Sequence, residues 1–176
     1  TAAFLSNGTL IIRDINSDST DGLTIRDNGA NIEIIDAGGL TINNSLAGGV
    51  GNGTSTVTVA KASITNGIII ESGALADTVT LETLGVTGGI DSDAETTNLN
   101  GDITASGLVR VRGAAVLTGD SSVDTSSGNA AVQFDSTLDG ANDLTVNAGS
   151  GAITATGAVG AGTVSYTHLR AHETSE

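Results

Sequence analysis

The residues most suited to metal chemistry lie near the C-terminus of the chain. His168 and His172 are four positions apart, and Glu173 follows the second histidine. On a helix this spacing would place both imidazoles on one face, as in many zinc sites. The zinc-protease signature also needs glutamate directly after the first histidine, and Leu169 occupies that position. We therefore predict no metal site in this segment.

Alternating acidic residues are the second candidate, a loose calcium loop. Asp91, Asp93 and Glu95 alternate along the chain, and Asp102 follows them. Carboxylate oxygens suit calcium, but the helix-loop-helix form of the site requires glycine where Thr96 stands. We interpret the segment as a solvated acidic turn, and the sequence leaves open whether acidic turns bind calcium weakly.

A glycine-rich run over residues 48–53 (GGVGNG) is the third candidate, for calcium or phosphate. The calcium-binding nonapeptide repeat needs aspartate where Gly53 stands. A phosphate-binding loop needs Lys-Ser or Lys-Thr after the glycines, and neither follows here. We expect a turn without a ligand.

Two closely spaced arginines are the remaining candidates, for polysaccharide cleavage. Hydrolysis needs paired carboxylates, and elimination needs basic residues beside calcium. The chain has no adjacent pair of aspartates, and Arg110 and Arg112 alternate with Val109 and Val111. This alternation predicts that both arginines point outward and balance the charge of an acidic surface. We predict no catalytic, cofactor-binding or metal-binding residue and no enzymatic activity; a polysaccharide-degrading β-helix enzyme is the remote alternative.

The composition limits what kind of core could position such residues. The chain has 176 residues, including 25 glycines, and lacks proline, cysteine, methionine and tryptophan. Its aromatic residues are Phe4, Phe134 and Tyr166. A core must therefore be thin and built from aliphatic and threonine side chains, because large rings are nearly absent. The net charge of −14 argues against binding to nucleic acid or to anionic membrane surfaces, and no apolar run is long enough to cross a bilayer.

Short alternating runs followed by glycine, asparagine or aspartate recur along the chain, and this pattern is typical of strands and turns. We expect strands over residues 9–13, 23–26, 32–35, 40–43, 56–60, 67–71, 78–82, 108–112, 131–135 and 144–147. In two of these runs we expect Leu40 and Ile42, and Val79 and Leu81, to face the core, with the threonine between each pair outside.

Apolar-Thr-apolar triads suggest how these strands repeat. They begin at Leu23, Leu40, Val57 and Val79, which gives spacings of 17, 17 and 22 residues. We predict a right-handed parallel β-solenoid, or β-helix, over residues 1–164, with rungs of about 17–24 residues and roughly eight rungs in all. Stacked aliphatic residues can fill its narrow interior, and proline would remove a hydrogen bond between strands. The alternative is a series of antiparallel β-sandwich repeats, which usually centre on large aromatic residues.

The stretch from residue 131 to residue 162 resembles the repeats of filamentous-haemagglutinin-like exoproteins, the β-strand-repeat surface adhesins of Gram-negative bacteria. The similarity lies in the sequence pattern of three segments, Leu117–Gly119 (LTG), Leu144–Gly149 (LTVNAG) and Gly157–Gly160 (GAVG). It implies an internal fragment of a larger protein that is secreted or lies on the outer-membrane exterior. There it would form the shaft or spacer of an adhesin.

The resemblance does not identify a receptor. For a shaft, the expected partners are the neighbouring repeats of the parent chain; the alternative is a strand face that binds a host glycan or a host surface protein. We expect no cofactor, no nucleic acid and no membrane insertion. Residues 165–176 (SYTHLRAHETSE) differ from the rest in composition and resemble translated sequencing-adapter or cloning sequence, so we expect a non-native tail there.

Overall fold

The computed structural model describes residues 1–13, 20, 22–36, 43–44, 51, 53–73, 75–160 and 165–170. These residues form eighteen strands and two short 3-10 helices, η1 (Lys61–Ser63) and η2 (Ser126–Gly128). No α-helix occurs within the described ranges. The predicted all-β class is therefore confirmed.

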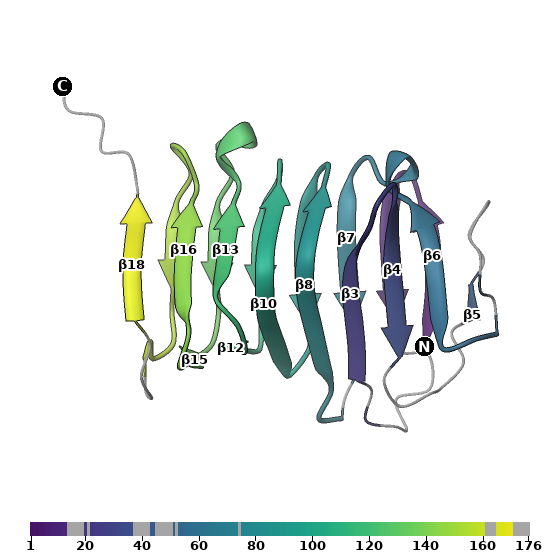
Figure 1. The fold of residues 1–176 in the computed structure, drawn as a ribbon, viewed down its shortest axis with the longest axis horizontal. Coiled ribbons are helices and arrows are strands. Elements are labelled where there is room, and N and C mark those ends of the chain that lie inside the picture. The colour runs from purple at the N-terminus through teal and green to yellow at the C-terminus, as the bar shows by residue number, and fades with distance from the viewer. Residues whose placement is uncertain are drawn as a thin grey trace.

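All eighteen strands belong to two facing sheets (Figure 1). The eight-stranded sheet has the spatial order β17 (Ile153–Ala155), β14 (Val132–Phe134), β11 (Val109–Val111), β9 (Gly89–Asp93), β7 (Gly67–Glu71), β2 (Thr9–Arg13), β1 (Ala2–Ser6) and β5 (Asn43–Asn44). The ten-stranded sheet has the order β18 (Ser165–Arg170), β16 (Asp143–Asn147), β13 (Ser121–Asp124), β10 (Thr96–Ala105), β8 (Thr78–Val86), β3 (Gly22–Asn28), β4 (Asn31–Asp36) and β6 (Thr56–Ala60). Beside β10 it also contains β12 (Ala114–Leu117), which pairs with β15 (Leu138–Gly140).

Residues 67–160 form a parallel coil that alternates between the two sheets. In Figure 1 the chain rises along the near, ten-stranded sheet, descends along the far sheet and advances towards its C-terminal end, which makes the coil right-handed. Equivalent residues lie 18 positions apart at Thr78 and Thr96, and 23 apart at Ala115 and Leu138. The predicted right-handed parallel β-solenoid with rungs of about 17–24 residues is confirmed.

The coil has about four turns, not the eight that the sequence predicted. The N-terminal strands explain the difference, because they lie antiparallel to one another: β1 pairs with β2, and β4 pairs with both β3 and β6. Leu23 lies beside Val79 and Val57 lies beside Ile34, so these triads do not mark successive turns. Leu40 and Ile42 lie outside the described residues.

Two hairpin turns account for two of these antiparallel pairs, β1 with β2 and β3 with β4. Ser6 pairs with Thr9 across Asn7 and Gly8, whose φ angles of 49° and 77° fit a type I′ turn. Gly29 takes φ 65° at the first central position of the next hairpin, as in a type II′ turn. The backbone twist of both turn types matches the right-handed twist of the strands they join. Each turn therefore returns the chain along the same sheet.

Aligned side chains fill the interior in columns that run along the coil. Two of these columns lie on the eight-stranded sheet: Leu10, Ile68, Ile90, Val109, Val132 and Ile153; and Ile12, Ile70, Ser92, Val111, Phe134 and Ala155. One on the ten-stranded sheet contains Ile25, Leu81, Leu99 and Leu117. Val79 and Leu81 are fully buried and Thr80 between them is not, so the predicted alternation is confirmed there.

Candidate functional site

The segment interpreted as a solvated acidic turn is only partly a turn, because Asp91 and Asp93 lie in strand β9, and its acidic residues make separate contacts. Asp91 accepts two hydrogen bonds from Arg112, at 2.8 and 2.6 Å. Glu95 accepts one from the backbone N–H of Asp77 at 3.1 Å, and Asp102 accepts one from the hydroxyl of Ser122 at 2.6 Å. Within the described ranges, no group of three or more His, Cys, Asp or Glu side chains could hold a metal ion.

The two arginines of β11 and its following corner lie on the outer surface and bind carboxylates. Arg110 donates from Nε to Asp135 at 2.6 Å, and Arg112 makes the bidentate pair with Asp91. The hydrogen bond to Asp91 raises the pKa of Arg112 above its already high ordinary value. The predicted outward orientation and charge balance are confirmed, and both cations are occupied within the chain.

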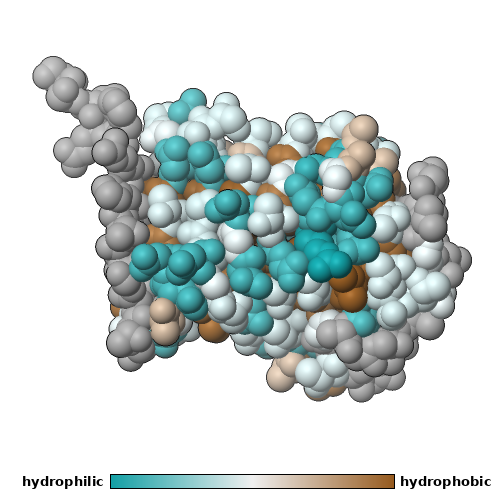
Figure 2. Space-filling view, viewed as in Figure 1, coloured by the Kyte–Doolittle hydropathy of each residue, from teal (hydrophilic) through white to brown (hydrophobic). Residues whose placement is uncertain are grey.

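A second charged cluster lies where the N-terminal strands meet the coil. Lys61 donates from Nζ to Asp27 at 2.7 Å, and the same carboxylate oxygen accepts the backbone N–H of Gly85 at 3.2 Å. Beside it, Arg26 forms ion pairs with Glu33 at 2.7 Å and with Glu82 at 3.5 Å. In Figure 2 the deepest hydrophilic colour lies over this part of the ten-stranded sheet. The cluster fastens β3 to β8.

Sequence reasoning missed this cluster because its partners are far apart along the chain. Asp27 and Lys61 are separated by 34 residues, and Arg26 and Glu82 by 56. The only available signal is the pair of adjacent charges at residues 26 and 27, and that pair does not identify the partners. The cluster becomes visible only when the register of β3 on β8 is known.

The corner after β13 is held by a carboxylate. Asp124 accepts hydrogen bonds from the hydroxyl of Ser126 at 2.6 Å and from its backbone N–H at 2.8 Å. These bonds favour the ionised form and lower the pKa of Asp124. Asn129 ends η2 with φ 49°, a left-handed conformation that asparagine tolerates. These contacts stabilise the turn, so the carboxylate of Asp124 has a structural role.

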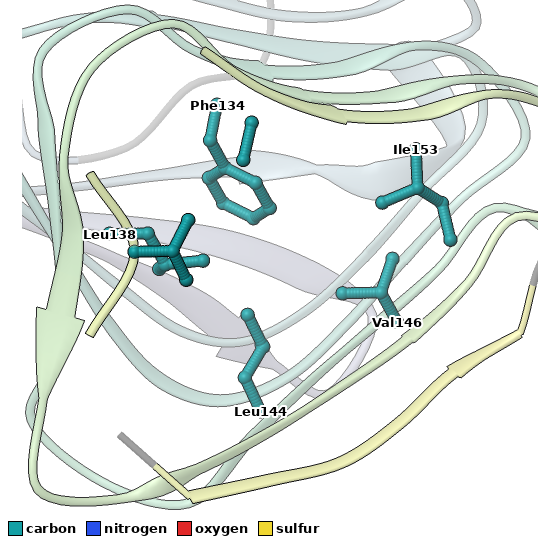
Figure 3. A pocket seen from close by; sticks show the side chains of 7 residues that line it. Phe134, Leu138, Leu144, Val146 and Ile153 are labelled. Carbon is teal, nitrogen blue, oxygen red and sulfur yellow. The ribbon is translucent and has the colours of Figure 1, made fainter. Parts of the chain in front are cut away.

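An apolar cavity opens at the C-terminal end of the coil (Figure 3). Its volume is about 290 Å³, and its walls include Phe134, Leu138, Leu144, Val146 and Ile153. These side chains come from the last two turns and point towards the coil axis. It is a concave surface without a charged group among its described lining residues.

The other sequence candidates lie mostly beyond what the structure describes. His172 and Glu173 lie outside the described residues, and of the run 48–53 only Gly51 and Gly53 are described. His168 belongs to β18, whose backbone pairs in parallel with β16. The prediction that this C-terminal segment holds no metal site therefore stays a prediction.

Comparison with known proteins gives no family for this chain. No protein-family model, no curated protein and no solved structure matches it. Over the described residues, no helix is long and apolar enough to cross a membrane.

Proposed function

We propose that this chain is a structural shaft or spacer segment of a secreted or cell-surface bacterial adhesin. The observation that carries the proposal is the stacking of equivalent residues in successive turns. Val109, Val132 and Ile153 lie in one column at spacings of 23 and 21 residues. Each turn contacts only its neighbours, so the length of the coil depends on the number of turns.

A stacked coil suits a mechanical role. Parallel strands lie about 4.8 Å apart, so every further turn of 18 to 23 residues lengthens the coil by about that distance. The backbone hydrogen bonds between turns run along the coil axis and resist stretching. A segment of this kind would hold a binding region at a fixed distance from the cell.

The outer charges give a second line of support. Five lysine and arginine residues between residues 13 and 112 pair with carboxylates of the same chain: Arg13 with Glu71, Arg26 with Glu33, Lys61 with Asp27, Arg110 with Asp135 and Arg112 with Asp91. These cations are therefore already engaged and offer little to an acidic glycan. This arrangement argues against a face that binds an acidic glycan.

The test changes the number of turns in the parent protein displayed on bacteria. Because Ala115 and Leu138 are equivalent positions, deleting residues 115–137 removes one turn in register. We expect small-angle scattering of the isolated chain to show a rod shorter by about 5 Å. Adhesion of the displayed parent should survive.

The matched control deletes residues 115–125, about half a turn, which removes β13 and all of β12 except its first residue. β11 is then followed directly by β14 of the same sheet, and because this parallel pair cannot be joined by so short a connection, the deletion should abolish folding. A recognition face would behave differently from a spacer. If Asp91→Ala or Arg110→Ala abolished adhesion while the circular dichroism spectrum stayed unchanged, the spacer function would be wrong.

A further inference from the structure

Asn-Gly dipeptides occur at residues 7–8, 28–29, 52–53, 66–67 and 100–101. This dipeptide can modify itself, because glycine has no side chain to keep its backbone nitrogen away from the amide of the preceding asparagine. The nitrogen attacks that amide carbon, a new N–C bond forms, and the side-chain nitrogen leaves as ammonia. Water then opens the resulting cyclic imide, which leaves either aspartate or isoaspartate. All of these asparagines except Asn52 belong to the described residues, and their surroundings differ.

The hairpin tip between β3 and β4, which lies beside η1, leaves its Asn-Gly peptide room to react (Figure 1). The glycine nitrogen must reach the asparagine side chain, so the peptide between the two residues has to turn. Asn28 and Gly29 are both exposed, and a Cβ on Gly29 meets nothing within 4 Å. No hydrogen bond to another described residue holds the N–H of Gly29, because the contact between the tip and η1 uses the carbonyl of Ala30.

The dipeptide in β10 is held by a hydrogen bond to the attacking nitrogen itself. Gly101 donates its N–H to the hydroxyl of Ser121 in β13 at 3.2 Å. A Cβ on Gly101 would lie 2.7 Å from Oγ1 of Thr83, so neighbouring turns of the coil enclose this peptide on both sides. Turning it towards the side chain of Asn100 would break the bond to Ser121.

The two remaining described dipeptides hold each other. Asn66 donates from Nδ2 to the carbonyl of Asn7, and this carbonyl belongs to the peptide that would have to turn for Asn7 to react. The backbone N–H of Asn66 also donates to the carbonyl of Gly8 at 3.0 Å. Gly67 is buried against Gly89 of the next turn, which leaves the peptide after Asn66 no space to turn.

We propose that Asn28 is a self-modifying site, which converts to isoaspartate or aspartate in the folded protein with water as the only co-reactant. The other described members of the set keep their amides over the same time: Asn7, Asn66 and Asn100. The proposal goes beyond the spacer function, because it rests on the hairpin tip alone.

The modification changes the charge and the backbone of the tip. Nδ2 of Asn28 donates to Oε1 of Glu33 at 3.4 Å, so the product replaces a donor with a second carboxylate beside Glu33. Like charges on neighbouring strands repel each other. Isoaspartate also adds one carbon to the backbone of the turn, which no longer fits a two-residue hairpin.

The test ages the full chain in mildly alkaline buffer and measures the modified fraction at each asparagine by peptide mapping with mass spectrometry. In the folded chain we expect Asn28 to react at least about tenfold faster than Asn100, because only its peptide is free to turn. In concentrated urea the rates at the two sites should become similar, since both then depend on the same Asn-Gly chemistry.

Two variants test the physical reason. Ser121→Ala removes the acceptor of the Gly101 N–H, and we expect Asn100 to react several-fold faster while Asn28 is unaffected. Asn28→Gln is the matched control, because glutamine would have to close a larger ring. It should abolish the product at the hairpin tip and leave the rate at Asn100 unchanged. Circular dichroism checks that each variant is folded.

Other outcomes would overturn the proposal. Equal rates at Asn28 and Asn100 in the folded chain would mean that the fold does not select the site. Faster reaction at Asn7 than at Asn28 would assign the modification to the other hairpin. An unchanged rate at Asn100 in folded Ser121→Ala would show that the hydrogen bond to the glycine nitrogen is not what protects it.

Discussion

The N-terminal hairpins and the C-terminal coil build the same two sheets by different connections. Asn7-Gly8 returns the chain along one sheet, and both residues have positive φ. Thr87-Gly88 is equally short, but only Gly88, with φ 88°, has a positive φ, and the chain crosses from β8 to β9 in the other sheet. Turns with positive φ at the first central residue suit a hairpin, whereas other short turns splay the strands. The φ angle of the first residue in a two-residue turn thus distinguishes a hairpin in the N-terminal region from a crossing between sheets in the coil.

The largest effect is expected at the boundary between the regions. Leu81 is fully buried and lies between Ile25 of the hairpins and Leu99 of the coil. Leu81→Asp would bury an unpaired charge there and should lower the free energy of unfolding by about 4 kcal/mol. Thr80→Asp, one residue away and facing outward, should cost about 0.5 kcal/mol. Urea unfolding measures both.

The same variant tests whether the two regions unfold together. We expect hydrogen exchange to accelerate in β3 and β4 as well as in β10 when Leu81 is replaced. Unchanged protection of the hairpins in Leu81→Asp would mean that they form an independent unit.

Glycines in the two regions should differ in their tolerance of a side chain. Gly67, with φ 103°, lies against Gly89 of the next turn, and a Cβ there would lie 2.1 Å from the Gly89 carbonyl oxygen. Gly29 also has a positive φ, 65°, but a Cβ there meets nothing within 4 Å. Gly67→Ala should therefore cost about 3 kcal/mol, and Gly29→Ala only about 1 kcal/mol of backbone strain.

Thermal unfolding of the two alanine variants makes the comparison direct. Equal losses of stability would show that backbone strain alone, and not contact between turns, requires glycine in the coil.

Smaller effects than those of Leu81→Asp and Gly67→Ala are expected at two charged side chains. Asp27 accepts hydrogen bonds from Lys61 and from the backbone of Gly85, so Asp27→Ala should cost about 1.5 kcal/mol. Asp91 bonds only to the exposed Arg112 among the hydrogen bonds given above, and Asp91→Ala should cost about 0.5 kcal/mol. Urea unfolding, at low and at high salt, should show a larger loss of stability for Asp27→Ala than for Asp91→Ala. A larger loss for Asp91→Ala would contradict this prediction.

The sequence contained the fold class, the rung length and the inward positions around Thr80, because a strand's side chains alternate whatever its partner is. It did not contain the pairing partners. The triads at Leu23 and Val57 look like those of the coil, yet their strands, β3 and β6, both pair antiparallel with β4. The Asn7-Gly8 dipeptide signals one antiparallel connection, between β1 and β2, because Asn-Gly favours a type I′ hairpin. It gives no information about the partners of β3 and β6. The triads alone therefore overestimated the number of turns.

The charged cluster and the cavity required the register of the coil. The contact between Asp27 and Lys61 depends on how β3 and η1 lie in the folded chain, 34 residues apart in sequence. The space above Phe134 exists because Ala155 is the next residue in its column, 21 positions later. No local pattern relates these two residues, so the cavity could not be predicted without the three-dimensional alignment of turns.

The five ion pairs within the chain also affect how closely neighbouring copies of such a rod can approach one another. The chain carries a net charge of −14, and its positive groups face its own carboxylates, so neighbouring rods present like charge to each other. The repulsion reaches about 8 Å at physiological ionic strength and about 3 Å in molar salt. Many such rods on one surface would stand apart as a brush whose lateral spacing tightens as the surrounding salt concentration rises.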